Sequence, residues 1–319
     1  MTPNSPHPSE GASGVSGVSG VAHTSEAPGG IVGTLQKIPV LHRPRREHAS
    51  NKTHTLLIFG AAALLLIAIV ASGRAAGELA LLTDFTQKNL GPGLEHWFGT
   101  DWMGRDMFLR TLAGLSLSVL VGLVAAGASA LIALLLGTAA ALGGRKLDTA
   151  ITWLIDLMLG IPHIVLLVLI SFALGKGFWG ITIGVAVTHW PTLARVIRAE
   201  ILQVKQAPYI EVARKLGRSR LSLALRHMLP FVFPQFLVGL VLLFPHAILH
   251  EAALTFLGFG LSPEAPAIGI ILSESMSYLS AGYWWLAVFP GVALVATVLL
   301  FDLAGSSLRK LIDPHTSQE

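Results

Sequence analysis

Six apolar stretches, separated by segments that carry most of the charged residues, dominate the chain from residue 55 onward. They cover residues 55–73, 111–144, 150–174, 178–194, 231–249 and 283–304. A helix needs about 20 apolar residues to cross the hydrocarbon core of a bilayer. Only helices satisfy this many backbone groups in lipid without closing a barrel. The pattern therefore predicts an all-α polytopic membrane protein with six transmembrane helices, of which the long second one is tilted or extends beyond the bilayer.

The composition agrees with a membrane protein and removes several classes of site. Of the 319 residues, 53% are hydrophobic and 13% are charged, against about 25% charged in soluble domains, and the mean hydropathy is +0.67. The chain has no cysteine, which excludes disulfides, iron–sulfur clusters and thiolate metal sites. The net charge of +4 does not indicate nucleic acid as a partner, because the basic residues are segregated as a bilayer requires.

The distribution of basic residues predicts the orientation. Of the 22 Lys and Arg residues, 17 lie in residues 1–54, 143–149, 195–230 and 305–319. Positive residues favour the cytoplasmic side, so both termini are expected in the cytoplasm. The start is rich in Ser, Gly and Pro and has no hydrophobic run typical of a signal peptide. We therefore expect a disordered basic tail (1–54), a six-span membrane domain (55–304) and a cytoplasmic C-terminal tail (305–319).

A basic, helical loop lies at residues 195–230, between two apolar stretches, and contains the sequence YIEVARKLGRSRLSLALRHMLP. Pro208 suits the first turn of a short helix, and Gly217 suits a left-handed end to it. Ser219 can cap a second short helix. From periodicity alone, this amphipathic hairpin could lie on anionic lipid headgroups or dock on a cytoplasmic partner.

The same loop carries a family resemblance. Glu211-Val212-Ala213, then Gly217, and later Leu229-Pro230 resemble the EAA loop of ABC importer permeases, although Val212 replaces a usual alanine. Three further segments resemble the dipeptide, oligopeptide and nickel branch of that family: HWFGTDWMGRDMFLR, HEAALTFLGFGLSP and FDLAGSSLRKLIDPH. Together they span residues from about 54 to 315. The chain is identified as similar to the smaller, C-type permease subunit of this branch.

The resemblance implies a function and a set of partners. The loop would insert a coupling helix into an ATPase subunit, with Glu211, Ala213 and Gly217 carrying the motif and Arg214, Lys215 and Arg218 adding electrostatic contacts. The expected partners are a B-type permease, two ABC ATPase subunits, an extracytoplasmic substrate-binding protein and the lipid of a bacterial inner membrane. The chain has no GxxxxGK[ST] phosphate-binding loop. It is therefore expected to be no enzyme and to bind no cofactor, with ATP and Mg²⁺ held by the ATPase subunits.

Histidines are the candidate residues for binding the transported substrate. His246 and His250 are spaced i, i+4 and so share a helix face, with Glu251 adjacent, and two imidazoles suit nickel or zinc. Interfacial histidines bonded to neighbours or water are the simpler interpretation. In the nickel branch a similar HxxxH arrangement occurs, and His189 in THWP resembles a further feature of it; His163 is a weaker candidate for the lining of the pathway. The resemblance thus favours nickel or a metal chelate as cargo, with a dipeptide or oligopeptide as the alternative.

Two other classes of protein are less consistent with these residues. An intramembrane metalloprotease would need an HExxH helix and a third ligand, whereas PHAILHE has the wrong order. Loss of peptide cleavage on His→Ala substitution would mark that class. A secondary transporter would often show internal repeats, none of which is visible here, and it would transport without an ATPase.

Overall fold

The computed structural model describes residues 46–312, and within this range the chain consists of helices and loops with no strand. The long helices are α1 (Arg46–Ala75), α2 (Met107–Leu142), α5 (Gly177–Lys205), α8 (Leu229–Phe256) and α10 (Trp285–Ile312). The shorter ones are α3 (Arg145–Gly160), α4 (His163–Ala173), α6 (Pro208–Lys215), α7 (Arg220–Leu223) and α9 (Ile268–Leu279). The expectation of an all-α protein is confirmed for the described residues. Most of the expected N-terminal tail (1–54) lies outside them, as does the end of the C-terminal tail beyond Ile312.

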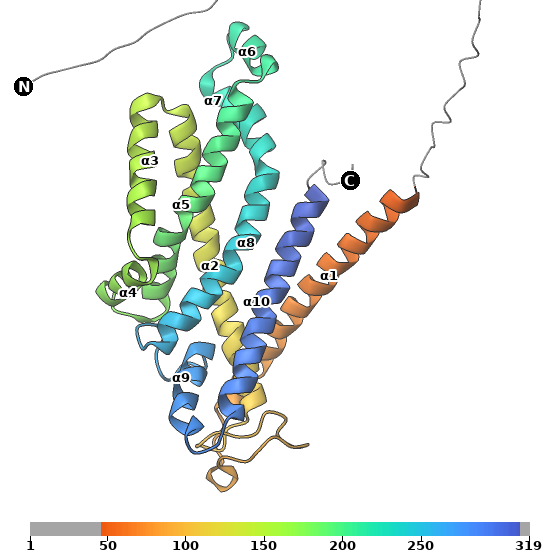
Figure 1. Cartoon of the computed structure of the whole chain (residues 1–319), viewed down its shortest axis with the longest axis vertical. Coiled ribbons are helices and arrows are strands. Elements are labelled where there is room, and N and C mark those ends of the chain that lie inside the picture. The colour runs from red at the N-terminus through yellow and green to blue at the C-terminus, as the bar shows by residue number, and fades with distance from the viewer. Residues whose placement is uncertain (1–45, 313–319) are drawn as a thin grey trace, which may run out of the picture. The chain divides into compact units, whose positions relative to one another are not determined.

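Helix α2 is the centre of the bundle. It packs against α5, α8 and α1, while α1 and α10 pack against each other on one side and α4 packs on α5 on the other (Figure 1). Close approach of α2 to α5 depends on a small residue, because a side-chain Cβ at Gly137 would lie 2.7 Å from the Ala194 carbonyl oxygen. Small residues are the usual means by which helices in membranes come together.

Four helical stretches are long and apolar enough to cross a membrane: residues 52–75, 107–142, 221–256 and 285–312. They correspond to the expected first, second, fifth and sixth stretches, the fifth being extended by a π-helical turn (Ala224–Met228) before α8. The bent pair α3 and α4 gives a fifth candidate when it is counted as one span. The expected total of six is not confirmed by these criteria.

The expected third span, residues 150–174, is wrong as a single helix. Helices α3 and α4 meet at a bend of 96°, where Ile161 is extended (φ −87°, ψ 136°) and Pro162 precedes α4. A proline disfavours the helical conformation in the residue before it, so the helix ends before Pro162. The expected fourth span falls in α5, which continues past residue 194 and carries Arg195, Arg198 and Lys205 in its second half.

Two groups of loops and short helices lie at opposite ends of the bundle. Helices α6 and α7 lie at one end, which is also the end at which α1 begins and α10 finishes (Figure 1). The segment before α2, with its short turns Leu79–Leu81 and Phe85–Gln87, lies at the other end with α9. The N-terminal end of α1, the C-terminal end of α10 and the basic loop thus share one end of the bundle.

Candidate functional site

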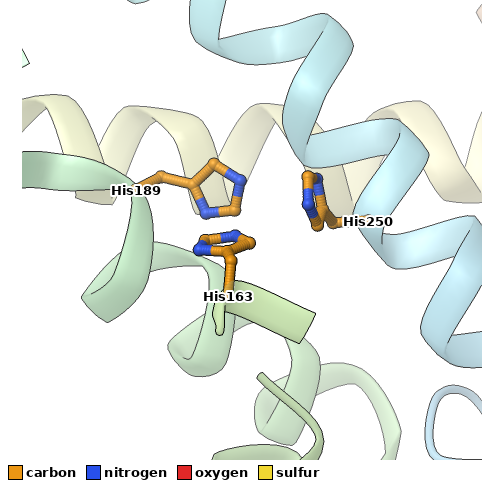
Figure 2. A group of neighbouring side chains, drawn as sticks. All are labelled: His163, His189 and His250. Atoms are coloured by element: carbon orange, nitrogen blue, oxygen red, sulfur yellow. The ribbon is translucent and has the colours of Figure 1, made fainter. Parts of the chain in front are cut away.

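Three histidines from three helices gather at one point. His163 is the first residue of α4, directly after the bend; His189 lies within α5 and His250 within α8. Their ring centroids are 4.5 to 4.9 Å apart in each pair, and the rings are nearly perpendicular, with interplanar angles of 81° to 83°. Figure 2 shows the three rings facing one another between the helices. One ring nitrogen from each histidine lies within 4.8 Å of one from each of the others.

Backbone hydrogen bonds orient two of these rings. The Nδ1 atom of His189 lies 3.0 Å from the Val185 carbonyl oxygen, and Nδ1 of His250 lies 2.7 Å from the His246 carbonyl oxygen. A carbonyl only accepts, so Nδ1 carries the proton in both rings and Nε2 keeps its lone pair. The Nε2 atom of His189 is buried and has no hydrogen-bond partner among the described residues. The cluster therefore offers unprotonated imidazole nitrogens in a partly enclosed place.

The structure separates the candidates that the sequence places together on α8. His250 joins His163 and His189, whereas the side chain of His246 is exposed and is not part of the group; its backbone carbonyl accepts the hydrogen bond from His250. Glu251 is fully buried beside Thr255, whose hydroxyl donates to Glu251 Oε1 at 2.8 Å. Its Oε2 atom has no partner among the described residues. Glu251 thus belongs to the interior of the bundle rather than to the histidine cluster.

The basic loop folds largely as its sequence predicts. Helix α6 begins with Pro208 and ends at Lys215, and Gly217 follows with a left-handed φ of +82°. The amide of Arg218 donates to the Ala213 carbonyl at 3.2 Å, which closes the end of the helix. Ser219 then caps the next helix, since its hydroxyl accepts from the Ser222 amide at 3.2 Å. These local contacts hold the loop in one defined shape.

Helix α6 presents most of its charged side chains outward. Only Ile210 of this helix is buried, and it packs into the core formed by α2, α3, α5 and α8. The remaining motif residues are exposed, except for the half-buried Ala213: Glu211, Arg214, Lys215, Gly217 and Arg218. Two large apolar side chains beside them, Val212 and Leu216, are also exposed, by 56% and 79%. The end of the bundle thus carries a surface that is both basic and apolar and that no described residue covers.

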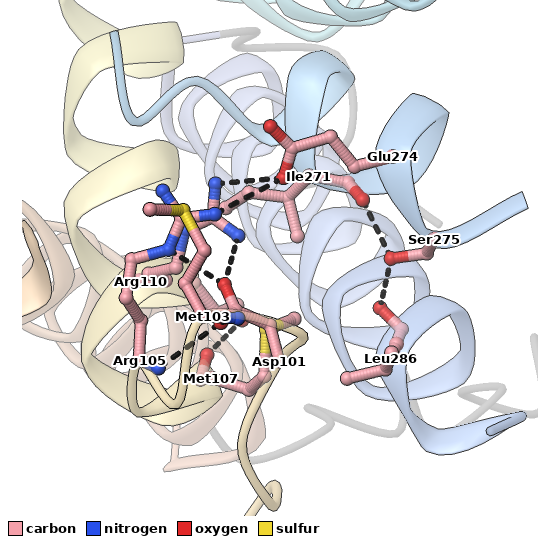
Figure 3. Close-up of polar contacts among 10 residues, drawn as sticks. Asp101, Met103, Arg105, Met107, Arg110, Ile271, Glu274, Ser275 and Leu286 are labelled. Carbon is pink, nitrogen blue, oxygen red and sulfur yellow. Dashed lines mark hydrogen bonds and ion pairs between the residues drawn. The ribbon is translucent and has the colours of Figure 1, made fainter. Parts of the chain in front are cut away.

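A buried ion network holds the opposite end. Asp101 accepts from Arg105 Nε and from Arg110 Nη1, each at 2.7 Å, and Arg110 Nη2 donates to Glu274 of α9 at 3.0 Å. Figure 3 shows these groups joining the loop before α2 to α9. Asp106 of the same loop caps α2 by accepting from the Leu109 amide at 2.9 Å. Asp101, Arg105 and Asp106 are the charged residues of the GTDxxGRD segment, so this segment has a structural role here.

Two residues that matter in the structure, His163 and Arg110, had little weight in the predictions from the sequence. His163 is alone in its segment, and only the bend at Pro162 brings it to His189 and His250. Arg110 is 3% exposed, although arginine is rarely buried without a partner. Its position at the start of a long apolar stretch was a signal that it had to be paired.

Among the described residues, several helices long and apolar enough to cross a membrane and a folded basic loop at one end of the bundle are consistent with a membrane protein. Comparison with known proteins identifies the class. Residues 133–318 match the family described as "Binding-protein-dependent transport system inner membrane component". The chain belongs to this family and is therefore an inner-membrane permease of an ABC importer, a class whose ATPase is a separate subunit.

Relatives and a solved structure agree. A Brucella abortus protein named as a peptide transport system permease is 38% identical over 228 residues, covering 72% of this chain and 76% of its own. The dipeptide transport system permease protein DppC of Bacillus subtilis is 31% identical over 229 residues, covering 72% of each chain. The inward-facing MetNI methionine ABC transporter has a similar fold, with a TM-score of 0.51 at 20% identity, covering 65% of this chain and 98% of that one. Both relatives are named for the transport of peptides or dipeptides.

Proposed function

We propose that this chain is one of two permease subunits of an ATP-driven importer of dipeptides or oligopeptides. The observation that carries the proposal is the identity of 31% to 38%, over more than 70% of the chain, with permeases named for peptide or dipeptide transport. Peptides are imported between the two permeases, so this chain supplies half of the pathway.

The proposed complex contains a B-type permease, two ABC ATPase subunits and an extracytoplasmic substrate-binding protein. In the proposed orientation the basic loop and both termini are cytoplasmic. The 17 basic residues on that side support this, as does the common location of α6, the start of α1 and the last turns of α10 (Figure 1). Six spans result if α5 also crosses the bilayer, which its uncharged first half, residues 177–194, favours.

In this proposal α6 is the coupling helix. Its exposed basic and apolar side chains are suited to a groove on an ATPase subunit, and Ile210 anchors the helix to the bundle core. Glu211 lies with Arg214 at a hollow between α5 and α6, where it can hold the loop or meet the partner. ATP binding and hydrolysis in the partners would then move α6 and alternate the access of the pathway.

Nickel or a metal chelate is a second candidate cargo. The observation that favours it is the cluster of His163, His189 and His250, since imidazole is a preferred ligand of nickel, copper and zinc. The pairing of His246 with His250 is less well supported, because the exposed His246 side chain is not one of the three that converge.

Uptake in cells distinguishes the two cargoes. Cells that lack the chromosomal copy of this chain but retain its partners are supplied with the wild-type chain or with an empty vector. Accumulation of a radiolabelled dipeptide and of ⁶³Ni²⁺ is measured in parallel. We expect chain-dependent dipeptide uptake; nickel uptake without dipeptide uptake would refute the peptide proposal and support the second candidate.

A further inference from the structure

In the cluster of His163, His189 and His250, hydrogen bonds fix the orientation of two rings in addition to the packing among the rings. Three rings from α4, α5 and α8 meet within 4.9 Å. In two of them the Nδ1 proton is already used by a backbone carbonyl of the same helix, one turn earlier. Histidines that bind metals almost always donate their other ring N–H to a carbonyl or carboxylate, which fixes the tautomer and the ring orientation. His189 and His250 therefore have the outer contacts of metal ligands.

The distances are close to those that a metal ion requires. Nitrogen ligands at the usual Zn–N length of about 2.0–2.1 Å in a tetrahedral site lie roughly 3.4 Å from one another. The ligand nitrogens of the cluster lie within 4.8 Å of one another, so each needs to move inward by at most about 0.8 Å to reach that spacing. Small side-chain rotations supply such a shift, and no helix has to move.

Edge-to-face packing of neutral rings is the competing explanation. Aromatic pairs favour this geometry at centroid distances of 4.5–7 Å, and all three ring pairs satisfy it. Packing does not, however, account for the Nε2 atom of His189, which is buried without a hydrogen-bond partner among the described residues. Buried polar atoms normally have a partner, and an exception calls for one that is supplied from outside the chain, such as a water molecule or an ion.

We propose that His163, His189 and His250 form a binding site for one divalent transition-metal ion. His189 and His250 bind through Nε2, and His163 completes the set from the bend between α3 and α4. Three neutral imidazoles favour nickel, copper, cobalt or zinc over magnesium or calcium, which prefer oxygen ligands. At least one coordination position remains for water or for a ligand of the cargo. The site goes beyond the peptide-import proposal, because metal binding is a property of this chain that is measured without transport.

The test is direct binding of Ni²⁺ and Co²⁺ to the full chain. The protein is purified with an affinity tag that contains no histidine and is held in lipid nanodiscs. Bound metal per chain is measured by equilibrium dialysis and mass spectrometry, and the visible spectrum of the Co²⁺ form reports nitrogen coordination of low symmetry. The variants are His163→Gln, His189→Gln and His250→Gln. His246→Gln is the matched control, since it changes an exposed histidine one turn from His250 on the same helix.

The wild-type chain should bind one ion that each of the three variants loses or binds at least about tenfold more weakly, which is the least that loss of a supporting contact typically causes. His246→Gln should bind like the wild type. Histidines elsewhere in the chain are present in all variants, so the measured quantity is the difference in bound metal between each variant and the wild type. Equal binding by the wild type and the three variants, or loss on His246→Gln alone, would overturn the proposal.

Folding and function are controlled separately. Each variant is checked by size-exclusion chromatography. If His189→Gln fails to fold, metal binding by His163→Gln tests the proposal instead. His163 is partly exposed at the start of α4, so its replacement should disturb the fold less. Dipeptide uptake is measured on the wild type and on the same variants. If the wild-type chain binds metal but supports no dipeptide uptake, the metal site stands and only the proposed cargo is refuted. If it supports dipeptide uptake but binds no metal, the metal site is refuted and the peptide proposal stands.

Discussion

Replacing Arg110 with methionine should destabilise the folded chain strongly. The Arg110 side chain is 3% exposed, and its guanidinium donates to Asp101 at 2.7 Å and to Glu274 at 3.0 Å. Methionine keeps most of the side-chain volume but leaves two carboxylates without this partner. Removing one member of a buried ion pair costs about 3–5 kcal/mol, because the remaining charge is buried and uncompensated.

The structure places the expected effect at the lower end of that range. Asp101 keeps the bond from Arg105 Nε at 2.7 Å and accepts from the backbone amides of Met103 and Arg105. The side chain of Glu274 is 28% exposed, so water can replace part of the lost contact. We therefore expect a loss of about 3 kcal/mol in the free energy of unfolding.

The assay is unfolding of the purified chain in mixed micelles, followed by circular dichroism. Lys88→Met is the control: Lys88 is an exposed cation in the same outer segment, 4.7 Å from the Phe85 ring centroid, and its loss should cost less than about 1 kcal/mol. In the double variant Asp101→Asn/Arg110→Met the effects should be less than additive, because the buried charge is also removed. Equal small losses for Arg110→Met and Lys88→Met would show that the network does not stabilise the fold.

Two glycines give further predictions. Gly137→Ala should destabilise the α2–α5 contact by about 1–3 kcal/mol, because the new Cβ would lie 2.7 Å from the Ala194 carbonyl oxygen. Gly127→Ala is the control on the same helix, because a Cβ there would have nothing within 4 Å. It should be neutral or stabilising in the same unfolding assay. Gly217→Val should weaken coupling of ATP hydrolysis to uptake, because a side chain there has free space but φ is +82°, which costs L-residues about 1–2 kcal/mol. Gly217→Asn, which tolerates this conformation, should retain more activity, and identical uptake by both variants would refute a role for the shape of the loop.

The sequence predicted well those elements that depend on local rules. Apolar length identifies α1, α2, α8 and α10, and Pro208, Gly217 and Ser219 mark the boundaries of the basic loop. Each of these features is decided by residues close together in the chain. Local patterns therefore sufficed for these four helices and for the loop.

Two features were missed, one local and one that depends on distant residues. Pro162 was visible within the third apolar stretch, but apolar length outweighed it, and the 96° bend followed from the conformation that a proline imposes on Ile161. That bend decides the position of His163. The spacing of His246 and His250 suggested a pair on one helix, whereas the partners of His250 come from α4 and α5. Contacts between helices cannot be obtained from the periodicity within one helix.

Uptake by a reconstituted transporter tests the central proposal most directly. Proteoliposomes containing this chain, its permease partner and the ATPase subunits are supplied with the binding protein and a radiolabelled dipeptide on the extracytoplasmic side, with ATP or a non-hydrolysable analogue on the other. We predict accumulation with ATP and none with the analogue. Accumulation that does not depend on ATP hydrolysis, or that persists when this chain is omitted, would contradict the proposal that it is a permease subunit of an ATP-driven peptide importer.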